Sequence, residues 1–279
     1  MSAAEMYRPM KNYDLSDQVA VITGGAGLLG REYGDVLSAA GAHVVVADIL
    51  GTKAADVAAQ VNKKSGVEAM SHATDVASPE SVKDLINTTI DKFGRIDILV
   101  NNAALDPKFD AAHHGEHTSN FENFPFAKWQ ESLDVNVTGM FLCAQAVAGP
   151  MLEAKSGIIV NISSTYGLVG PDQRLYEREG EANQYKPVTY SVAKAAVLGL
   201  TRYLATYFRG SGIRVNTLTP GGVVADHDEE FMERYAEKTI LNRMANPEEI
   251  SSALLFLVSP ASSYMTGSNL IVDGGWTAW

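Results

Sequence analysis

The sequence predicts a single α/β domain in which a parallel sheet is wound on both faces by helices. Three observations lead to this prediction: seven short runs rich in β-branched residues, longer segments of helical period between them, and glycines or polar caps where the two meet. The strand runs are nearly continuous in apolar residues, which is typical of parallel strands covered on both faces. Strands that alternate with helices favour one doubly wound sheet with right-handed crossovers.

Each predicted element follows from a local pattern. The predicted strands span residues 18–23, 43–48, 67–75, 96–104, 157–164, 213–219 and 268–274. The predicted helices span residues 28–41, 52–66, 78–94, 128–154, 187–210 and 246–259. The third helix has the clearest limits, because Ser78 can cap its N-terminus, Pro79 suits the first helical position and Gly94 ends it.

The chain of 279 residues has no linker, repeat or shift in composition that would divide it. Single α/β domains of about 250 residues are common, so we expect an N-terminal extension over residues 1–15 and one domain over 16–279. Two segments, 105–126 and 165–187, interrupt the alternation of strands and helices. Both follow the carboxyl ends of strands, where ligands bind in such sheets, and loops of this length are usually functional.

Composition excludes several classes of protein. With 22 basic and 33 acidic residues the net charge is −11, which repels a nucleic-acid backbone, so we expect no nucleic-acid partner. No run approaches about 18 uncharged apolar residues and the N-terminus has no apolar core, so we expect no membrane partner, no signal peptide and a cytoplasmic location. The one cysteine, Cys143, lies in an apolar run and is expected to be buried rather than nucleophilic.

A glycine-rich loop, TGGAGLLG over residues 23–30, lies between the first strand and the first helix. Gly24, Gly27 and Gly30 permit a tight turn and let backbone amides approach a diphosphate. The helix that opens with Leu28 and Leu29 adds the positive end of its dipole. Strand, loop, helix and second strand follow in the order of a Rossmann-type dinucleotide site, so we expect a nicotinamide cofactor here.

Asp48 ends the second strand, 18 residues after Gly30. An acidic side chain at about this distance accepts hydrogen bonds from the adenosine ribose and repels a 2′-phosphate. NAD is therefore favoured. NADP stays open because Arg31 directly follows the loop.

Tyr190 and Lys194 stand four residues apart in the predicted helix over 187–210, so their side chains share one face. A free tyrosine titrates near pKa 10 and is a poor acid or base at neutral pH. An ammonium at about 5 Å, in a medium of effective dielectric about 20, stabilises the phenolate by roughly 3 kcal/mol. We therefore expect Lys194 to lower the pKa of Tyr190 toward the range useful for general acid–base catalysis.

Together with other motifs, this pair resembles the short-chain dehydrogenase/reductase family over essentially residues 16–279. The motifs are the glycine loop, Asp75-Val76, Asn101-Asn102-Ala103-Ala104, Asn136 in LDVNVTG, Ser164 in NISS, Tyr190 with Lys194, NTLTPG over 216–221 and VDGGW near the end. The resemblance implies an oxidoreductase that transfers a hydride between a nicotinamide cofactor and a secondary alcohol or ketone.

The resemblance also implies a role for each matching residue. Tyr190 would be the proton donor and acceptor, and Lys194 would lower its pKa and bind the nicotinamide ribose. Ser164 would hydrogen-bond the substrate oxygen, and Asn136 would anchor a water in the proton relay. The implied cofactor contacts are Asp75 and Val76 at the adenine, Asn102 and Ala103 near the cofactor ribose, and Pro220, Gly221 and Val223 at the nicotinamide.

The chain departs from the usual pattern of the family in three places. Leu28 stands where the single-domain branch usually has a glycine, and the resulting spacing is similar to that of the extended branch, which has a large C-terminal substrate domain. Because only four residues follow Gly275, we expect the single-domain branch. Ala225 stands where a threonine is frequent. Ser164 and Tyr190 are 26 residues apart, more than is usual, because of the charged insertion over 165–187.

The insertion is expected to set substrate choice. Its guanidinium and carboxylate groups suit a sugar or a sugar-derived acid, and STYGLVGPDQRLYE looks like oxidoreductases of bacterial surface-sugar and flagellin modification. We expect Tyr166, Arg174 and Gly222 to contact the substrate. His113, His114 and His117 form HHGEH in the other segment, but no helix is evident there and no metal is expected.

Two other functions compete with this interpretation. A 3-oxoacyl reductase should prefer NADPH and an apolar pocket, and Asp48 argues against it. A dinucleotide-sensing protein without activity would commonly lack the tyrosine or the lysine, and both are present. By resemblance, the helices near 128–153 and 187–209 would form a homodimer interface, often within a homotetramer.

Overall fold

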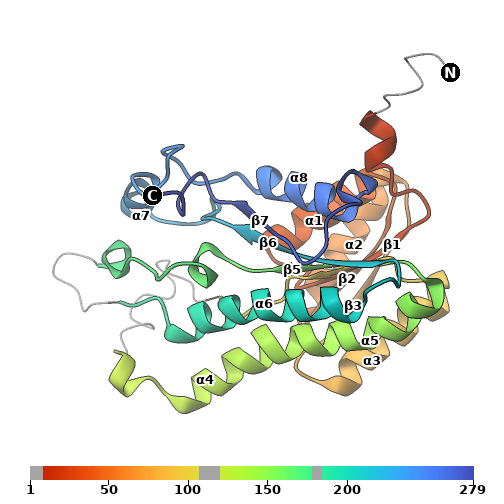
Figure 1. The fold of residues 1–279 in the computed structure, drawn as a ribbon, viewed down its shortest axis with the longest axis horizontal. Helices are drawn as coiled ribbons and strands as arrows, with labels where there is room; N and C mark the ends of the chain where they lie inside the picture. Colours follow the sequence, from red (N-terminus) through yellow and green to blue (C-terminus); the bar gives the residue numbers. More distant parts are fainter. Residues whose placement is uncertain (1–8, 107–119, 178–183) are drawn as a thin grey trace.

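The computed structural model describes residues 9–106, 120–177 and 184–279. Within these ranges, seven strands form one parallel sheet in the order β3-β2-β1-β4-β5-β6-β7 (Figure 1). The strands are β1 Val19–Thr23, β2 His43–Asp48, β3 Ala69–Ala73, β4 Ile98–Asn101, β5 Gly157–Ile162, β6 Ile213–Pro220 and β7 Asn269–Val272. The predicted doubly wound sheet is thereby confirmed.

Helices cover both faces of the sheet. The α-helices are α1 Leu28–Ala39, α2 Gly51–Ser65, α3 Pro79–Phe93, α4 Phe126–Leu133, α5 Gly139–Ala154, α6 Val188–Tyr207, α7 Glu229–Ala236 and α8 Pro247–Val258. Short helical turns are η1 Pro9–Tyr13, η3 Phe121–Asn123, η4 Asp134–Thr138, η5 Thr165–Gly167, η6 Gln173–Tyr176 and η7 Pro260–Ser262. In Figure 1, α1, α2 and α8 lie above the sheet and α3, α5 and α6 lie below it.

Two apolar cores follow from this arrangement, one on each face. Side chains of α1, α2 and α8 pack on one face with alternate residues of the strands, and those of α3 and α5 pack on the other. Leu15, the last residue of the predicted extension, is fully buried in the first of these cores. Cys143 is buried in the second, and burial raises the pKa of its thiol to about 12, as expected for a packing residue.

The predicted helix over 128–154 is interrupted. Between α4 and α5, residues Asp134–Thr138 form a turn of π-helix, in which the amide of Gly139 donates to the carbonyl of Asp134. Such turns widen a helix locally and are frequent at functional sites. Here the turn carries Asn136.

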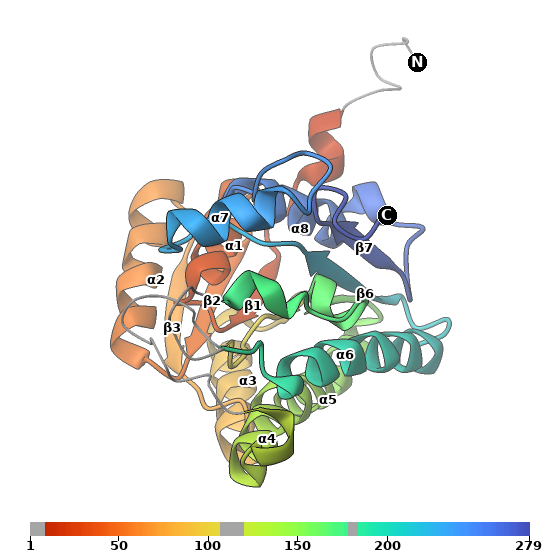
Figure 2. The ribbon, with the colours of Figure 1, turned by 90° about the vertical axis from the view of Figure 1, so that its left-hand side faces the viewer.

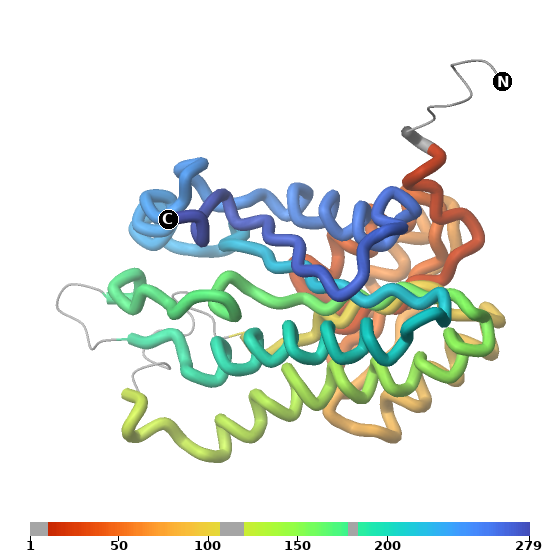
Figure 3. Tube along the Cα trace, viewed as in Figure 1, coloured from red at the N-terminus to blue at the C-terminus, as the bar shows by residue number. Residues whose placement is uncertain are grey.

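The carboxyl ends of the strands meet at one end of the molecule, which faces the viewer in Figure 2. The segments that follow β5 and β6 gather there, together with α7 and the chain after β7. Figure 3 shows the chain after β6 running beside the C-terminal segment, and hydrogen bonds from Gly221 N to Val272 O and from Leu241 N to Gly274 O join the two. This end holds the candidate site.

Candidate active site

The glycine loop after β1 has no room for a side chain at Gly24 or Gly30. Gly24 has a φ of +62°, and a Cβ there would lie 2.8 Å from Cα of Ala103. A Cβ on Gly30 would lie 2.2 Å from the carbonyl oxygen of Gly24. The amide of Gly27 closes the turn by donating to Gly24 O over 3.1 Å. The loop therefore brings the chain directly from the end of β1 into α1, as a diphosphate site requires.

The N-terminus of α1 has no side-chain cap. The helix begins at Leu28, after Gly27 as N-cap residue, and no side chain accepts from its first amides. In α3, by contrast, Ser78 accepts from the amide of Ser81. Leu28 is about half exposed, beside Leu29 at the same helix end. An uncapped N-terminus behind a glycine turn suits the diphosphate of a dinucleotide.

Asp48 fastens the loop to the end of β2. Its Oδ2 accepts from Ala26 N over 3.0 Å and its Oδ1 from Leu50 N over 2.9 Å. Each carboxylate oxygen keeps a further lone pair, so the group can still accept from ribose hydroxyls. Arg31 turns back on the same loop, because its Nε donates to Ala26 O over 3.0 Å.

Asn102 and Ala103 support the loop from the end of β4. The Nδ2 of Asn102 donates to Thr23 O and Gly24 O, each over 3.0 Å. Thr23 Oγ1 accepts from the amides of both Asn102 and Ala103, over 3.0 and 3.1 Å. These two residues therefore shape the cofactor side of the site through the loop itself.

Asp75 and Val76 follow β3. Asp75 is exposed, and its Oδ1 accepts from the amide of Ala77 over 2.9 Å. Val76 is buried against Gly139, where an added Cβ would lie 2.7 Å from Cγ2 of Val76. Their expected contacts with an adenine remain predictions.

Three predicted catalytic residues converge at the carboxyl end of β5. Ser164 follows β5, and its side chain lies close enough to Tyr190 to lower the pKa of that phenol. Tyr190 lies one helical turn before Lys194 on α6. Nζ of Lys194 donates to Ile162 O over 2.9 Å and lies 5.8 Å from the centre of the Tyr190 ring. Tyr190 and Lys194 are both buried, so the spacing of four residues places the pair as expected.

The pKa of Tyr190 is shifted upward, whereas the sequence predicted a downward shift. Burial raises the pKa of Tyr190 well above 10, and the carboxylate of Asp106 adds to this, while the hydrogen bond with Ser164 lowers it. Burial also lowers the pKa of Lys194 to about 8. Desolvation disfavours the charged form of each group, and a sequence does not reveal how deeply the pair is buried.

Asn136 is fully buried in the π turn. Its Oδ1 accepts from Leu105 N over 2.7 Å, and its Nδ2 donates to Leu105 O over 3.1 Å. The side chain therefore fixes the start of the 105–126 segment beside the site. A water held by Asn136 remains a prediction.

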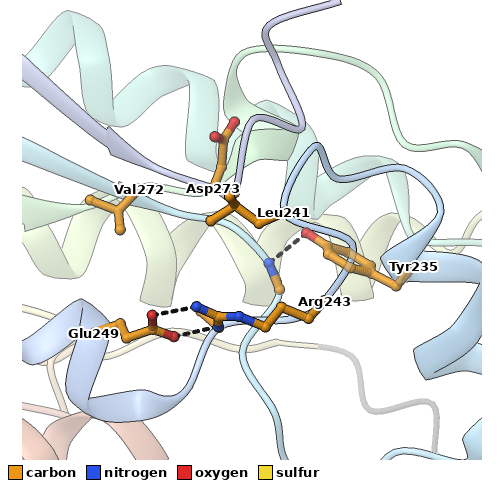
Figure 4. A pocket seen from close by; sticks show the side chains of 9 residues that line it. Tyr235, Leu241, Arg243, Glu249, Val272 and Asp273 are labelled. Carbon is orange, nitrogen blue, oxygen red and sulfur yellow. Dashed lines mark hydrogen bonds and ion pairs between the residues drawn. The ribbon is translucent and has the colours of Figure 1, made fainter.

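The segment after β6 holds the remaining predicted cofactor residues. Gly221 packs closely on Asp273, because a Cβ added to Gly221 would lie 2.8 Å from Cα of Asp273. Val223 forms a parallel bridge with Ala245. Gly222 N donates to the hydroxyl of Tyr235, as Figure 4 shows. This segment, which starts at Pro220, is thus held by α7 and by the C-terminal chain. Ala225 offers no hydroxyl there.

A small pocket lies behind this segment. Figure 4 shows Arg243 and Glu249 paired on one of its sides, and two hydrogen bonds of 2.6 Å join their guanidinium and carboxylate. Its other lining residues include Gly222, Tyr235 and Asp273. The carboxylate of Asp273 already accepts from Gly275 N and Thr277 N. The polar groups of this pocket therefore serve the local structure.

An aromatic cluster surrounds Tyr190. Its buried members are Tyr166, Leu175, Tyr176, Tyr190, Phe231, Tyr235, Met244 and Trp276. Tyr176 donates its hydroxyl hydrogen to the Tyr166 oxygen over 3.2 Å, and Tyr235 stacks on Trp276 with ring centres 4.4 Å apart. Of this cluster, only Tyr166 and Tyr190 were predicted from the sequence to be site residues. The spacing of Phe231 and Tyr235, four residues apart in EEFMERYA, was the available signal for α7.

The charged groups of the insertion pair largely with each other and with α7. Arg174 makes a bidentate pair with Asp172, over 2.8 and 2.6 Å, and its side chain is 74% exposed. Lys238 reaches the same carboxylate over 2.7 Å. Arg234 donates to the carbonyls of Arg174 and Glu177. These contacts hold the insertion to α7, and contact of Arg174 with substrate remains a prediction.

Two predicted absences concern metals and membranes. The histidines of HHGEH fall outside the described residues, and among those described no group of three metal-ligating side chains is found.

The helical stretch Phe126–Ala154 is long and apolar enough to cross a membrane by length and composition alone. Its Cys143, Val147 and Met151 pack in the core, as in the inner helix of a globular domain. The lack of a membrane partner stays a prediction.

Comparisons with known proteins identify the family of this chain. The family model described as enoyl-(acyl carrier protein) reductase matches residues 26–277. A 3-oxoacyl-[acyl-carrier-protein] reductase of Synechocystis is 36% identical over 94% of this chain and 97% of its own. The cis-4-hydroxycyclohexanecarboxylate dehydrogenase of Sinomonas cyclohexanicum is 34% identical over 94% of this chain and 98% of its own.

Among solved structures, a gluconate 5-dehydrogenase of Burkholderia cenocepacia, in complex with NADP and tartrate, superposes with a TM-score of 0.85. It is 28% identical and covers 98% of this chain and 100% of its own. The family model, the relatives and the sheet order together identify the family. The chain belongs to the short-chain dehydrogenase/reductase family and is an oxidoreductase acting on CH–OH or ketone groups.

Proposed function

We propose that this enzyme is an NAD(H)-dependent dehydrogenase of a small polar secondary alcohol of the sugar or sugar-acid class. One observation carries the proposal: Ser164, the neighbouring Tyr190 and Lys194 one turn further on lie at the same edge of the sheet as the glycine loop and Asp48. The loop fits a dinucleotide, since an added Cβ at Gly30 would fill the turn. The cofactor supplies hydride acceptance or donation at its nicotinamide.

The chain's own residues would then handle the proton and the substrate oxygen. Tyr190 removes the hydroxyl proton in oxidation and returns it in reduction. The hydroxyl of Ser164 has one hydrogen, and with substrate bound it would donate that hydrogen to the negative charge that develops on the substrate oxygen instead of to Tyr190. Lys194 places a positive charge beside both while its Nζ is held by Ile162 O.

Asp48 supports NAD over NADP. Its carboxylate lies at the end of β2 with two amides bound, so a 2′-phosphate there would meet a negative charge. Arg31, the cation that directly follows the glycine loop, bonds the carbonyl of Ala26 through Nε. Because the similar gluconate 5-dehydrogenase structure contains NADP, the test below includes both NAD and NADP.

The aromatic cluster supports a ring-bearing or polyhydroxylated substrate. Aromatic faces pack on the apolar side of such molecules, while a tyrosine hydroxyl can bond a polar group. The hydroxyls of Tyr166 and Tyr176 bond each other here. The names of two similar proteins point the same way, one acting on gluconate and one on a hydroxycyclohexanecarboxylate. A 3-oxoacyl reductase is the second candidate, favoured by the 36% identical relative.

Initial rates of cofactor absorbance change test the proposal. The panel contains polyols, aldonates, cyclic alcohols and acetoacetyl-CoA, each with NAD(H) and with NADP(H). We expect turnover of a polar alcohol or acid, with kcat/KM at least about tenfold higher for NAD. Preference for acetoacetyl-CoA with NADPH would replace the first candidate by the second. Tight NADH binding without turnover on the whole panel would favour a dinucleotide-sensing protein.

The proposed assembly is a homodimer or homotetramer built through α5 and α6. Both helices expose large apolar side chains, among them Phe141 on α5 and Val192, Tyr203 and Tyr207 on α6. Apolar groups gathered on neighbouring helices are typical of protein interfaces. Light scattering after size-exclusion chromatography tests this, and a monomer at micromolar concentration would contradict it.

A further inference from the structure

Lys186 lies at the end of the insertion, two residues before α6, and is held in place at its backbone. Its amide donates to Gln173 Oε1 over 2.9 Å, and its carbonyl accepts from Gln173 Nε2 over 3.4 Å. Its side chain is 9% exposed. A lysine is rarely buried this far unless its charge is used, so the insertion delivers an ammonium group to a defined position.

That position is the face of the Tyr190 ring. Nζ of Lys186 lies 4.2 Å from the ring centre, nearer than the 5.8 Å of Lys194. Asp106, which follows β4, accepts from Nζ of Lys186 over 2.8 Å and is 58% exposed. A pair joining the segments after β4 and β5 thus meets over the ring of the residue expected to exchange the proton.

The other groups around Tyr190 are mostly neutral at neutral pH. They are Ser164 and Tyr166 after β5, Tyr176 in η6 and Tyr235 on α7, while Lys194 on α6 adds a positive charge. His227, near the Asp106–Lys186 pair, has its pKa lowered by burial and is mainly uncharged. Among the described residues, the charged groups found near the Tyr190 ring are therefore the ammonium groups of Lys186 and Lys194 and the carboxylate of Asp106.

We propose that Lys186 is a positioning residue for the acid–base chemistry of Tyr190: its ammonium stabilises the phenolate, and Asp106 limits that effect. The reason is electrostatic, because a positive charge within about 5 Å of the ring favours the ionised phenol and a carboxylate beside it opposes this. The insertion thereby tunes the tyrosine as well as lining the site. This inference rests on the proposed role of Tyr190.

The test compares pH profiles of four proteins: wild type, Lys186→Gln, Asp106→Asn and the double variant. For alcohol oxidation, kcat/KM should rise with pH through the apparent pKa of Tyr190. We call this rise the basic limb of the profile. We expect Lys186→Gln to shift the midpoint of the limb to higher pH by about one unit, and Asp106→Asn to shift it to lower pH by about as much. The double variant should lie near wild type. Opposite shifts that cancel are a signature that mere loss of packing would not give.

A second measurement does not depend on turnover. In protein with isotope-labelled tyrosine rings and bound NAD, the Cζ chemical shift of Tyr190, assigned by difference from Tyr190→Phe, reports its ionisation directly. The apparent pKa of Tyr190 should be highest in Lys186→Gln, lowest in Asp106→Asn and intermediate in wild type and the double variant. If no substrate in the panel is turned over, the proposed function fails while this titration still decides the inference.

Two controls separate charge from structure. Lys186→Arg keeps the charge and should keep the wild-type limb, even if Lys186→Gln folds poorly. Lys238→Gln removes a cation that pairs with Asp172 on the insertion and should leave the limb unchanged. Shifts of Lys186→Gln and Asp106→Asn in the same direction, or an unmoved limb in Lys186→Gln, would overturn the inference.

Discussion

The cofactor side and the substrate side of this site are built by different means. The glycine loop, Asp48 and Asn102 are joined mainly through backbone amides and carbonyls, and Gly24 and Gly30 leave no room for a Cβ. The surroundings of Tyr190 consist of side chains from η5, η6, α7 and the C-terminal segment. A site for an invariant group can be made of main chain, whereas a site for a particular substrate needs side chains that can vary.

The difference predicts how each side responds to substitution. A change in the glycine loop should disturb binding of every dinucleotide, because the backbone itself must move. A change in the aromatic cluster should alter turnover or substrate choice and leave dinucleotide binding intact. The following predictions test this division, beginning with the largest expected effect.

Tyr190→Phe should lower kcat by about a thousandfold or more, because the proton acceptor is lost. The dissociation constant of NADH, measured by fluorescence, should stay within about threefold of wild type if the two sides are independent. Tyr176→Phe is the matched control: it removes one buried hydroxyl and its 3.2 Å bond to Tyr166, and should cost less than about tenfold in kcat/KM. Undiminished turnover by Tyr190→Phe would remove the basis of the mechanism.

Gly30→Ala should weaken NADH binding by at least about tenfold and lower the free energy of unfolding by about 1–3 kcal/mol. The added methyl would lie 2.2 Å from Gly24 O, so the loop must shift. Gly34→Ala in the same helix is the control, since its Cβ would lie 3.6 Å from the nearest atom of Val61. Alanine there should stabilise α1 by about 0.5–1 kcal/mol and leave NADH binding unchanged. Equal effects of the two substitutions would contradict the geometry of the loop.

Lys194 should make the free energy of unfolding depend on pH. Burial lowers its pKa to about 8, from an ordinary value near 10.5. Below pH 8 both the folded and the unfolded chain hold this proton and the cost of the buried charge is complete. Between pH 8 and 10 the unfolded chain binds the proton more strongly, so the free energy of unfolding should rise with pH, by about 2 kcal/mol.

Urea unfolding at pH 7 and at pH 10 measures this rise. Lys194→Met should lack it, whereas Lys128→Met, at an exposed lysine of α4, should keep it. The pKa of Tyr190 is raised, which lowers stability only above about pH 10 and thus opposes the rise outside this range. Identical pH dependence of wild type and Lys194→Met would mean that Lys194 is not desolvated in solution.

The same division explains what the sequence could and could not predict. The seven strands and the glycine loop depend on local patterns, and both lie where expected. The spacing of Tyr190 and Lys194 placed them on one face of α6, but their burial, and so the direction of the Tyr190 shift, depends on distant segments. Helix α7 was missed because EEFMERYA is short and highly charged, with only Phe231 and Tyr235 facing inward.

The interruption of the helix over 128–154 was missed for a related reason. Residues Asp134–Thr138 continue the helical pattern of their neighbours, and nothing in DVNVT breaks it. The turn is π-helical where Asn136 bonds the backbone of Leu105, a contact across 31 positions of the chain. Contacts of that kind arise from tertiary structure and leave no local signal.

Arg174→Gln should have the smallest effect on kcat/KM. It tests whether this charged side chain of the insertion belongs to the substrate side of the site. The sequence suggested that this guanidinium meets the substrate, but it is exposed and bound to Asp172. A surface pair of this kind contributes less than about 1 kcal/mol, so kcat/KM should stay within about twofold to threefold. Asp172→Asn should do more, because Asp172 also holds Lys238 of the segment after α7. Steady-state kinetics of both variants decide whether Arg174 contacts the substrate or only pairs with Asp172. A large rise in KM from Arg174→Gln alone, with Asp172→Asn near wild type, would show that Arg174 contacts the substrate.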